Sequence, residues 1–198
     1  ADATYTNPFK NQWRGAVLMT LPDTLYEVRV TFIDPDGVSG GTQVVGQVRT
    51  RADNPPAGGA TFFVSGSGSD ANPGTQAAPI RTIAKANQLM GANKKFLFRR
   101  GDTFDLDSSL QINHANVLIG AYGSGNKPVF RWIGGSSGFS DLMHINNLST
   151  ALVIQDLNLT SATIPSTTAP RAVHPSGNNI TVRRCQFSNM RDAMNSEA

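Results

Sequence analysis

The chain has 198 residues and a formal net charge of +3; 39% of its residues are hydrophobic and 16% are charged. This length allows one large domain or two small ones, and the scattered Lys and Arg residues do not indicate a nucleic-acid partner. The single cysteine, Cys185, excludes a disulfide within the chain and a cysteine-based metal site, and no apolar run reaches the ~18 residues of a membrane-spanning helix.

Residues 1–53 predict β-strands. Segments 16–19, 26–32 and 44–50 are strand-like, and in the second of them apolar and polar residues alternate. One face of that strand carries Tyr26, Val28, Val30 and Phe32. Turn residues lie at 21–24 and at 34–37, so these strands are expected to be joined by tight connections.

The same region resembles the second half of a fibronectin type III domain. The resemblance rests on residues 21–30 (LPDTLYEVRV), on Asp36-Gly37 and on the closing segment 49–51 (RTR), with Tyr26 at the place of that family's core tyrosine. A whole domain of this kind needs about 100 residues. The resemblance therefore implies a partial antiparallel β-sandwich acting as a spacer, followed by a linker at 54–60 that is rich in proline and glycine.

Residues 61–198 have a different pattern. A short strand at 61–65 is followed by a Gly- and Ser-rich loop at 66–75. A helix is predicted over 80–90, because Ile80, Ile83, Ala84 and Asn87 fall on one helical face. A strand at 95–99 and a turn at 100–104 come next.

This order resembles the N-terminal cap of pectate-lyase-like, right-handed parallel β-helix proteins. The motif residues are Val64, Ser65, Gly68, Ser69, Asp70, Asn72, Pro73, Gly74, Thr75, Pro79, Thr82 and Ile83, followed by Gly101, Asp102, Thr103 and Phe104. The resemblance implies an all-β fold in which the short helix covers the first coil. It says less about the reaction.

An internal repeat supports the same fold. Segment 151–160 aligns with 179–188 at an offset of 28, and an earlier copy at 116–122 aligns at 35. The matched apolar pairs are Leu152/Ile180, Ile154/Val182, Leu157/Cys185, Leu159/Phe187 and Ile145/Val173. No unit can bury its apolar row alone, so successive coils are expected to stack over 61–198 around a shared core that includes Cys185.

Lyases of this resembled family need a base and a cation, often Ca²⁺, that neutralises a uronate carboxylate. Many carry an Asp-His pair in a strand whose counterpart here is 180–184, where Arg183 and Arg184 stand in place of both residues. No cofactor is therefore evident, and a Ca²⁺ site would lack its expected ligand at Arg183. The arginine pair either binds an anionic sugar directly or is simply solvated.

Two histidines are further catalytic candidates. If Ile145 and Val173 point inward, His144 and His174 point outward on neighbouring coils and can share proton transfer, although a lone surface histidine is often inert. Trp132, Asp156 and Asp192 are candidate substrate-binding residues, with a solvated or turn position as the alternative for each aspartate. Asp141 is a further candidate acid, Tyr122 fits a core column better than a sugar, and His114 lies at a turn.

The leading hypothesis is a secreted or surface protein that acts on an acidic polysaccharide, as a lyase or a glycoside hydrolase. The alternative is a non-catalytic adhesin, or a structural β-helix in a phage tail or an extracellular fibre. The expected partners are polysaccharide and the other domains of a longer chain, and the expected location is extracellular, on a cell surface or on a phage particle. Fold analogy alone favours the lyase over the hydrolase.

Overall fold

A computed structural model of the chain describes residues 20–33, 35–50, 56, 58–134, 140–148, 151–162, 170–177 and 180–194. The chain divides into two compact units, Ala1–Asn54 and Pro55–Ala198. Each unit is described by itself. In the described part of the chain, no helix has both the length and the apolar character needed to cross a membrane.

The first unit contains an antiparallel pair of strands, β1 (Leu25–Thr31) and β2 (Gln43–Arg49). Tyr26 and Val28 are half-buried while Glu27 and Arg29 are exposed, as the predicted alternation requires, but Val30, predicted on the same face, is exposed. The hydroxyl of Tyr26 accepts a hydrogen bond of 2.7 Å from the backbone N–H of Leu21. The resemblance to fibronectin type III stays a prediction, since the described strands form only a two-stranded ribbon.

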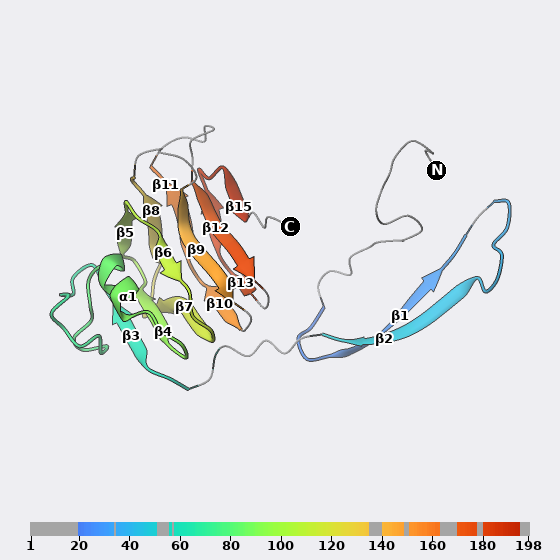
Figure 1. The fold of residues 1–198 in the computed structure, drawn as a ribbon, viewed down its shortest axis with the longest axis horizontal. Coiled ribbons are helices and arrows are strands. Elements are labelled where there is room, and N and C mark those ends of the chain that lie inside the picture. Colours follow the sequence, from blue (N-terminus) through green and yellow to red (C-terminus); the bar gives the residue numbers. More distant parts are fainter. Residues whose placement is uncertain are drawn as a thin grey trace. The chain divides into compact units, whose positions relative to one another are not determined.

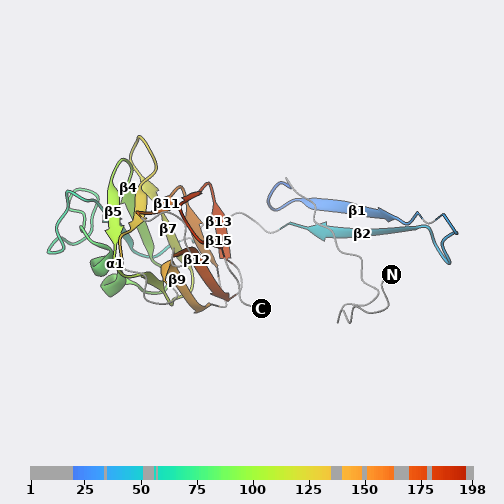
Figure 2. The ribbon, with the colours of Figure 1, turned by 90° about the horizontal axis from the view of Figure 1, so that it is seen from above.

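The second unit is a parallel β-helix built from three sheets (Figure 1). The first sheet has the strand order β13-β10-β7-β4-β3, the second β14-β11-β8-β5 and the third β15-β12-β9-β6. Four coils contribute one strand to each sheet in turn, β3 adds a fifth strand to the first sheet, and Figure 2 shows the strands lying side by side along the stack. The strands are β3 (Thr61–Val64), β4 (Lys95–Arg99), β5 (Thr103–Leu106), β6 (Leu110–Ile112), β7 (Val117–Tyr122), β8 (Val129–Trp132), β9 (Asp141–Leu148), β10 (Leu152–Gln155), β11 (Asn158–Ser161), β12 (Arg171–Gly177), β13 (Ile180–Arg183), β14 (Gln186–Ser188) and β15 (Asp192–Met194).

The strand registers confirm most of the repeat. Ile154 pairs with Val182 and with Ile119, so residues at offsets of 28 and 35 are vertical neighbours. Leu159 pairs with Phe187 in the second sheet. The predicted pairing of Ile145 with Val173 is wrong, because the third sheet pairs Val173 with Met143 instead. The offset between β9 and β12 is 30 from Arg171 to Pro175, and it changes only at the register shift between Pro175 and Gly177.

The core is a continuous apolar column inside the coils. Three phenylalanines, Phe98, Phe104 and Phe130, form its aromatic centre, with ring centroids 4.6–5.8 Å apart in edge-on arrangements. Cys185 packs against this core as expected, and burial raises the pKa of its thiol. A thiol with a raised pKa is a poor nucleophile, so Cys185 contributes packing.

The helix α1 (Ile83–Leu89) is shorter than predicted. It begins after Thr82, whose hydroxyl accepts a hydrogen bond from the backbone N–H of Lys85. Asp70 fixes this start, because its carboxylate accepts hydrogen bonds from the backbone N–H and the hydroxyl of Thr82. The helix buries Ile83 and Ala86, whereas Ala84, predicted on the inner face, is exposed.

Asn87 closes the open edge of β6. Its side-chain amide donates to the carbonyl of Ser109 at 3.0 Å, and its side-chain oxygen accepts from the backbone N–H of Gln111 at 2.9 Å. An unpaired strand edge invites pairing with another chain. The Asn87 amide stands in for the missing neighbouring strand, and α1 therefore covers the first coil as the resemblance implied.

The motif residues at the N-terminal cap are structural. Asp102 accepts hydrogen bonds of 2.9 Å from the hydroxyl of Ser65 and from the backbone N–H of Gly66, which joins the two parts of the motif. A Cβ atom on Gly68 would lie 2.4 Å from the carbonyl oxygen of Pro79, so only glycine fits there. These contacts explain why the pectate-lyase-like motif is present: its residues build the N-terminal cap, and none of these contacts requires a catalytic role.

An asparagine pair stacks at another turn. The amide of Asn116 donates to the side-chain oxygen of Asn93 at 2.6 Å, and both residues have positive φ angles of 58° and 59°. Asparagine tolerates this conformation better than most residues. This asparagine pair links two successive coils at the turn before β4 and β7.

Replacing Asn87 by alanine is expected to lower the free energy of unfolding of the full chain by about 1–3 kcal/mol, because two backbone groups of the β6 edge lose their partners. Gln88→Ala is the matched control. It changes the exposed neighbour on the same helix and should cost less than about 0.5 kcal/mol. Urea denaturation followed by circular dichroism measures both, and equal stabilities of the two variants would contradict the edge-capping role of Asn87.

Candidate functional site

Four polar side chains come together where β9 and β12 stack. Arg171 pairs in register with Asp141, and His174 pairs with His144 three residues further along both strands. Neighbouring strands lie about 4.8 Å apart, so equivalent side chains on successive coils are in contact range. The register thus builds one cluster from two pairs that are 30 residues apart in sequence.

Asp141 and Arg171 form the buried base of this cluster. Each side chain is only 4% exposed, and Arg171 Nε donates to Asp141 Oδ1 at 2.6 Å. The side chains of His144 and His174 are 29% and 16% exposed, so they lie between the ion pair and the solvent. The buried pair holds the rings, and the rings form the accessible part of the site.

Four atoms of the cluster form a ring in which hydrogen-bond donors and acceptors alternate. Arg171 Nη2 lies 3.3 Å from Asp141 Oδ2, which lies 2.8 Å from His144 Nδ1. His144 Nδ1 lies 3.3 Å from His174 Nδ1, which lies 3.1 Å from Arg171 Nη2. Arginine can only donate and an ionised carboxylate can only accept. His144 Nδ1 can give its one proton to Asp141 Oδ2, while His174 Nδ1, which also lies 3.3 Å from Asp141 Oδ2, can accept from Arg171 Nη2.

In this assignment the two imidazoles are opposite tautomers. A neutral His144 with its proton on Nδ1 has an unprotonated Nε2, which is a proton acceptor. A neutral His174 that accepts at Nδ1 carries its proton on Nε2, which is a proton donor. Neither Nε2 atom is hydrogen bonded to a described residue. The cluster can therefore present one base and one acid side by side, with ring centroids 5.0 Å apart.

Asp141 remains ionised in this environment. Burial by itself raises the pKa of the Asp141 carboxyl, but hydrogen bonds from Arg171 and His144 and the charge of Arg171 outweigh it, so the pKa is lowered overall. An aspartate held in this state cannot act as a proton donor near neutral pH. Its role is to orient His144 and to stabilise that ring when it takes up a proton.

Asp141, His144 and His174 have ligand atoms within 4.8 Å of one another, which is the spacing of a metal site. The guanidinium of Arg171, however, contacts the same ligand atoms at 3.1–3.3 Å and supplies the positive charge itself. Calcium prefers six to eight oxygen ligands, and this cluster offers one carboxylate and two imidazoles. The donor set fits an arginine-centred site better than a calcium site.

Arg183 and Arg184 lie elsewhere, at the turn between the first and second sheets. Arg183 Nε donates to the side-chain oxygen of Gln155 at 2.8 Å. Arg184 binds Asp156 through two nitrogens at 2.8 and 2.9 Å, and both residues of this pair have positive φ angles. These arginines link successive coils, and the structure does not bring them to the histidines.

The other predicted site residues are dispersed. Trp132 is 6% exposed and belongs to the core, so its ring is not presented to a sugar. Asp192 pairs in register with Arg171 on the far side from Asp141, but its carboxylate binds Arg191 at 3.0 Å. Tyr122 packs edge-on against Phe63. His114, the third histidine, has a buried Nδ1 without a partner among the described residues.

Arg171 was not among the sequence candidates, although it organises the cluster. The sequence does contain one indication of its role. Arg171 follows Asp141 by 30 residues, and His174 follows His144 by the same number. The offset of 28 taken from the other two sheets hid this coincidence. Opposite charges at one position of two stacked strands predict an ion pair only when the register is known.

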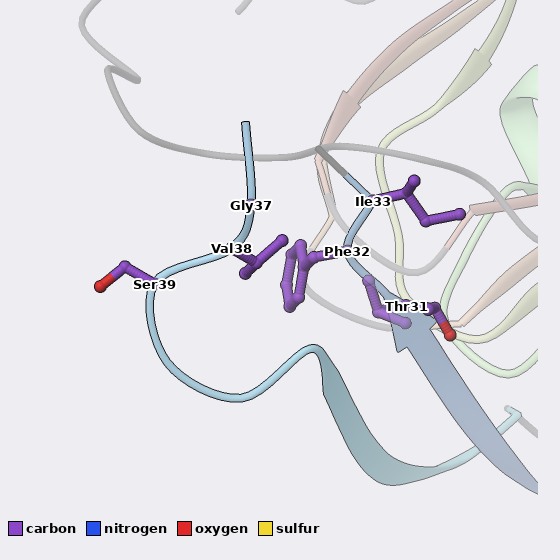
Figure 3. A pocket seen from close by; sticks show the side chains of 7 residues that line it. Thr31, Phe32, Ile33, Gly37, Val38 and Ser39 are labelled. Atoms are coloured by element: carbon purple, nitrogen blue, oxygen red, sulfur yellow. The ribbon is translucent and has the colours of Figure 1, made fainter. Parts of the chain in front are cut away.

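Three of the surface hollows formed by described residues contain no part of this cluster. One lies in the first unit beside the turn after β1, and none of its lining residues is titratable. Figure 3 shows Phe32 and Val38 facing one another there, while Ser39 points away. The second hollow, lined by Arg81 and Asp105 among others, lies beside the start of α1. The third borders the starts of β8, β11 and β14 and contains Arg100 and Lys127.

No protein-family model matches the chain, and a search of curated proteins gives no match either. Among solved structures, the chain is similar to the native GH136 lacto-N-biosidase from Eubacterium ramulus, with a TM-score of 0.52 and 19% identity over 65% of this chain and 26% of that one. The selenomethionine derivative of the same protein gives a TM-score of 0.50 at the same identity and coverage. The likeness shows the fold, and the chain spans about a quarter of the length of that enzyme.

Replacing Asp141 by asparagine is expected to lower the free energy of unfolding by about 3–5 kcal/mol, since Arg171 is left buried without its anion. Asp105→Asn is the control, because it breaks the Arg131–Asp105 ion pair whose side chains are 45% and 42% exposed. Its loss should be much smaller, since exposed pairs are screened by water. Similar losses in both variants, measured by urea denaturation at neutral pH, would contradict a buried ion pair.

The pH dependence of this loss has a definite sign. Because the fold lowers the pKa of Asp141, the pair's contribution is complete above the unfolded pKa of about 3.9 and disappears as pH falls through the lower folded value. The stability difference between the unaltered protein and Asp141→Asn should therefore shrink below about pH 4. A difference that stays constant down to acid unfolding would argue against an ionised Asp141.

Nitrogen-15 NMR of the histidine rings tests the opposite tautomers. We expect the proton on Nδ1 of His144 and on Nε2 of His174 in their neutral forms. Signals are assigned with His144→Gln and His174→Gln, and His114→Gln removes the third histidine. In Arg171→Met the constraint on His174 should be lost and its proton should redistribute. Identical tautomers on both rings of the unaltered protein would disprove the proposed hydrogen-bond ring.

Proposed function

We propose that the β-helical unit acts on a polysaccharide by proton transfer at His144 and His174. One observation carries the proposal: a partly exposed imidazole, His144, is held by a buried ionised aspartate at 2.8 Å. This is the arrangement in which a histidine serves as a general base. The stacked coils of a β-helix support the polysaccharide part of the proposal, since such solenoids present extended surfaces to extended ligands.

β-Elimination from an acidic polysaccharide matches the chemistry of the cluster best. His144 Nε2 takes the proton from the carbon next to the uronate carboxylate, and the electrons of that C–H bond form a carbon–carbon double bond. The bond to the glycosidic oxygen breaks, and His174 Nε2–H supplies the proton that the leaving oxygen needs. The products are an unsaturated uronate end and a shortened chain, and no water is consumed.

Glycoside hydrolysis is a second candidate, favoured by the fold shared with a glycoside hydrolase. That reaction usually requires two carboxyl groups, one of which donates a proton. Asp141 is the carboxylate within the cluster, and its buried ion pair with Arg171 prevents this role. A hydrolase would therefore have to use carboxylates outside the cluster, which makes the lyase the better supported reaction.

The protein would work outside the cell, on a cell surface or on a phage particle, where polysaccharides are met. The first unit would serve as a fibronectin-type spacer between the β-helix and other domains of a longer chain. A non-catalytic adhesin or fibre is the competing function, and it predicts binding without any change in the glycan.

The test is incubation of the protein with a panel of uronate-containing polysaccharides, including polygalacturonate and alginate. A lyase produces ultraviolet absorbance from the new double bond, whereas a hydrolase produces reducing ends without this absorbance. We expect absorbance with at least one polymer, and a loss of about 10²–10⁴-fold in rate in His144→Gln.

His114→Gln is the matched control, because it removes an imidazole outside the cluster and should leave the rate unchanged. Reducing ends without absorbance would replace the lyase by the hydrolase. No reaction with any polymer, from protein that still binds them, would replace both by the adhesin. Equal rates in His144→Gln and in the unaltered protein would show that the histidine cluster does not take part in the reaction.

A further inference from the structure

The third hollow lies at the turn between the first and second sheets and has a volume of about 450 Å³. Its floor consists of Val129, Asn158 and Gln186, the first residues of β8, β11 and β14, which are vertical neighbours on three successive coils. Its rim is formed by Arg100 and by the excursion 125–127 between β7 and β8. The hollow is therefore an elongated feature that runs across the stacked coils.

Positive charge dominates this hollow. Arg100 and Lys127 line it directly, and Arg184, at the equivalent turn one coil beyond Asp156, pairs with that aspartate. Asp156 is the one acidic group that these three cations surround among the described residues, and its pKa is lowered chiefly by its hydrogen bonds from Arg184, with further contributions from the charges of Arg100 and Lys127. Three cations around one anion leave a surplus of two positive charges.

The described residues do not satisfy this surplus. Arg184 is committed to Asp156, but Arg100 Nη2 is 3.8 Å from the same carboxylate, beyond hydrogen-bond length, and its Nη1 reaches only the carbonyl of Gly125 at 3.4 Å. Lys127 is half-buried and makes no hydrogen bond or close ion pair with any described residue. Arg100 and Lys127 thus have hydrogen-bond donors left for a ligand.

The floor adds uncharged hydrogen-bonding groups. Asn158 and Gln186 are register partners on adjacent coils, whose strands lie about 4.8 Å apart, and their side-chain amides make no hydrogen bond with the described part of the chain. An amide offers both a donor and an acceptor, as the hydroxyl groups of a sugar require. The combination of unsatisfied cations and free amides fits an anionic saccharide better than a bare inorganic ion.

We infer that this hollow binds an anionic group of a saccharide, a uronate carboxylate or a sulfate ester, between Arg100 and Lys127, with the sugar hydroxyls on Asn158 and Gln186. The hollow is separate from the histidines, since it borders the first residues of β8 and β11 whereas Asp141 and Arg171 follow after these strands have ended. The inference shares the class of ligand with the proposed function and does not require any reaction.

The test is a binding titration of the full chain by calorimetry, in the unaltered protein and in His144→Gln. The probes are a galacturonate hexamer, its fully methyl-esterified counterpart, and a sulfated galactan oligomer of the same length. We expect binding of at least one anionic oligomer and a loss of about tenfold in affinity in Lys127→Met or Arg100→Met, since each variant removes one charge-assisted hydrogen bond. Lys127→Arg should restore most of the affinity.

Lys85→Met is the matched control, because it removes the same charge from α1, outside the hollow, and should leave the affinity unchanged. Binding of the galacturonate or of the sulfated oligomer alone identifies the anionic group. Equal affinity for the methyl-esterified hexamer, equal losses in Lys85→Met and Lys127→Met, or no binding of either anionic oligomer would overturn the inference. An inactive protein that shows the expected binding pattern would overturn the proposed reaction alone.

Discussion

Parallel stacking of one coil on the next is the interaction on which the rest of this structure depends. Each short strand has backbone groups on both edges and an apolar row on one face, and neither is satisfied within a single coil. Stacking satisfies both at once, because the register that aligns the hydrogen bonds also aligns the apolar rows. Ile119, Ile154 and Val182 show this directly, since they form one vertical column on three successive coils.

The same register determines the chemistry of the surface. A residue on one coil lies beside its counterpart on the next, so like side chains are brought together and opposite charges can pair. His144 and His174 are neighbours for this reason, and so are Asp141 and Arg171. Two histidines at van der Waals distance would be unfavourable if both were charged. The buried ion pair avoids this outcome, because it assigns a hydrogen-bond donor to one ring and an acceptor to the other.

The fold was largely readable from the sequence, whereas the site was readable only in part. The pairs Ile154/Val182 and Leu159/Phe187 follow from a simple apolar repeat, and that repeat directly reports burial. The repeat also predicted that the two histidines lie on neighbouring coils. It predicted an offset of 28 residues between these coils, whereas the third sheet has an offset of 30, because the connections between coils differ in length. Trp132 shows a second limit of prediction from sequence. Successive residues of a strand face the core and the solvent in turn, and the sequence beside this loop does not reveal which of the two faces carries Trp132.

Arg171 could not have been found by residue type alone. Its importance comes from being buried opposite Asp141, and burial of a charged residue is a property of the register and of the surrounding loops. Asn87 had been assigned to the inner face of a helix, which is correct, yet its role as the partner of a strand edge is visible only in the hydrogen bonds of Ser109 and Gln111.

The two hydrogen bonds of the Asn87 side-chain amide also affect how these molecules associate with one another at high concentration. Two β-helices that met end to end through β6 would have to displace a side chain that already occupies both of the backbone groups needed for the new contact. The entropic cost of freeing an attached amide is not repaid by an equivalent bond from another molecule. At the β6 edge, the solenoid therefore resists end-to-end pairing with another molecule.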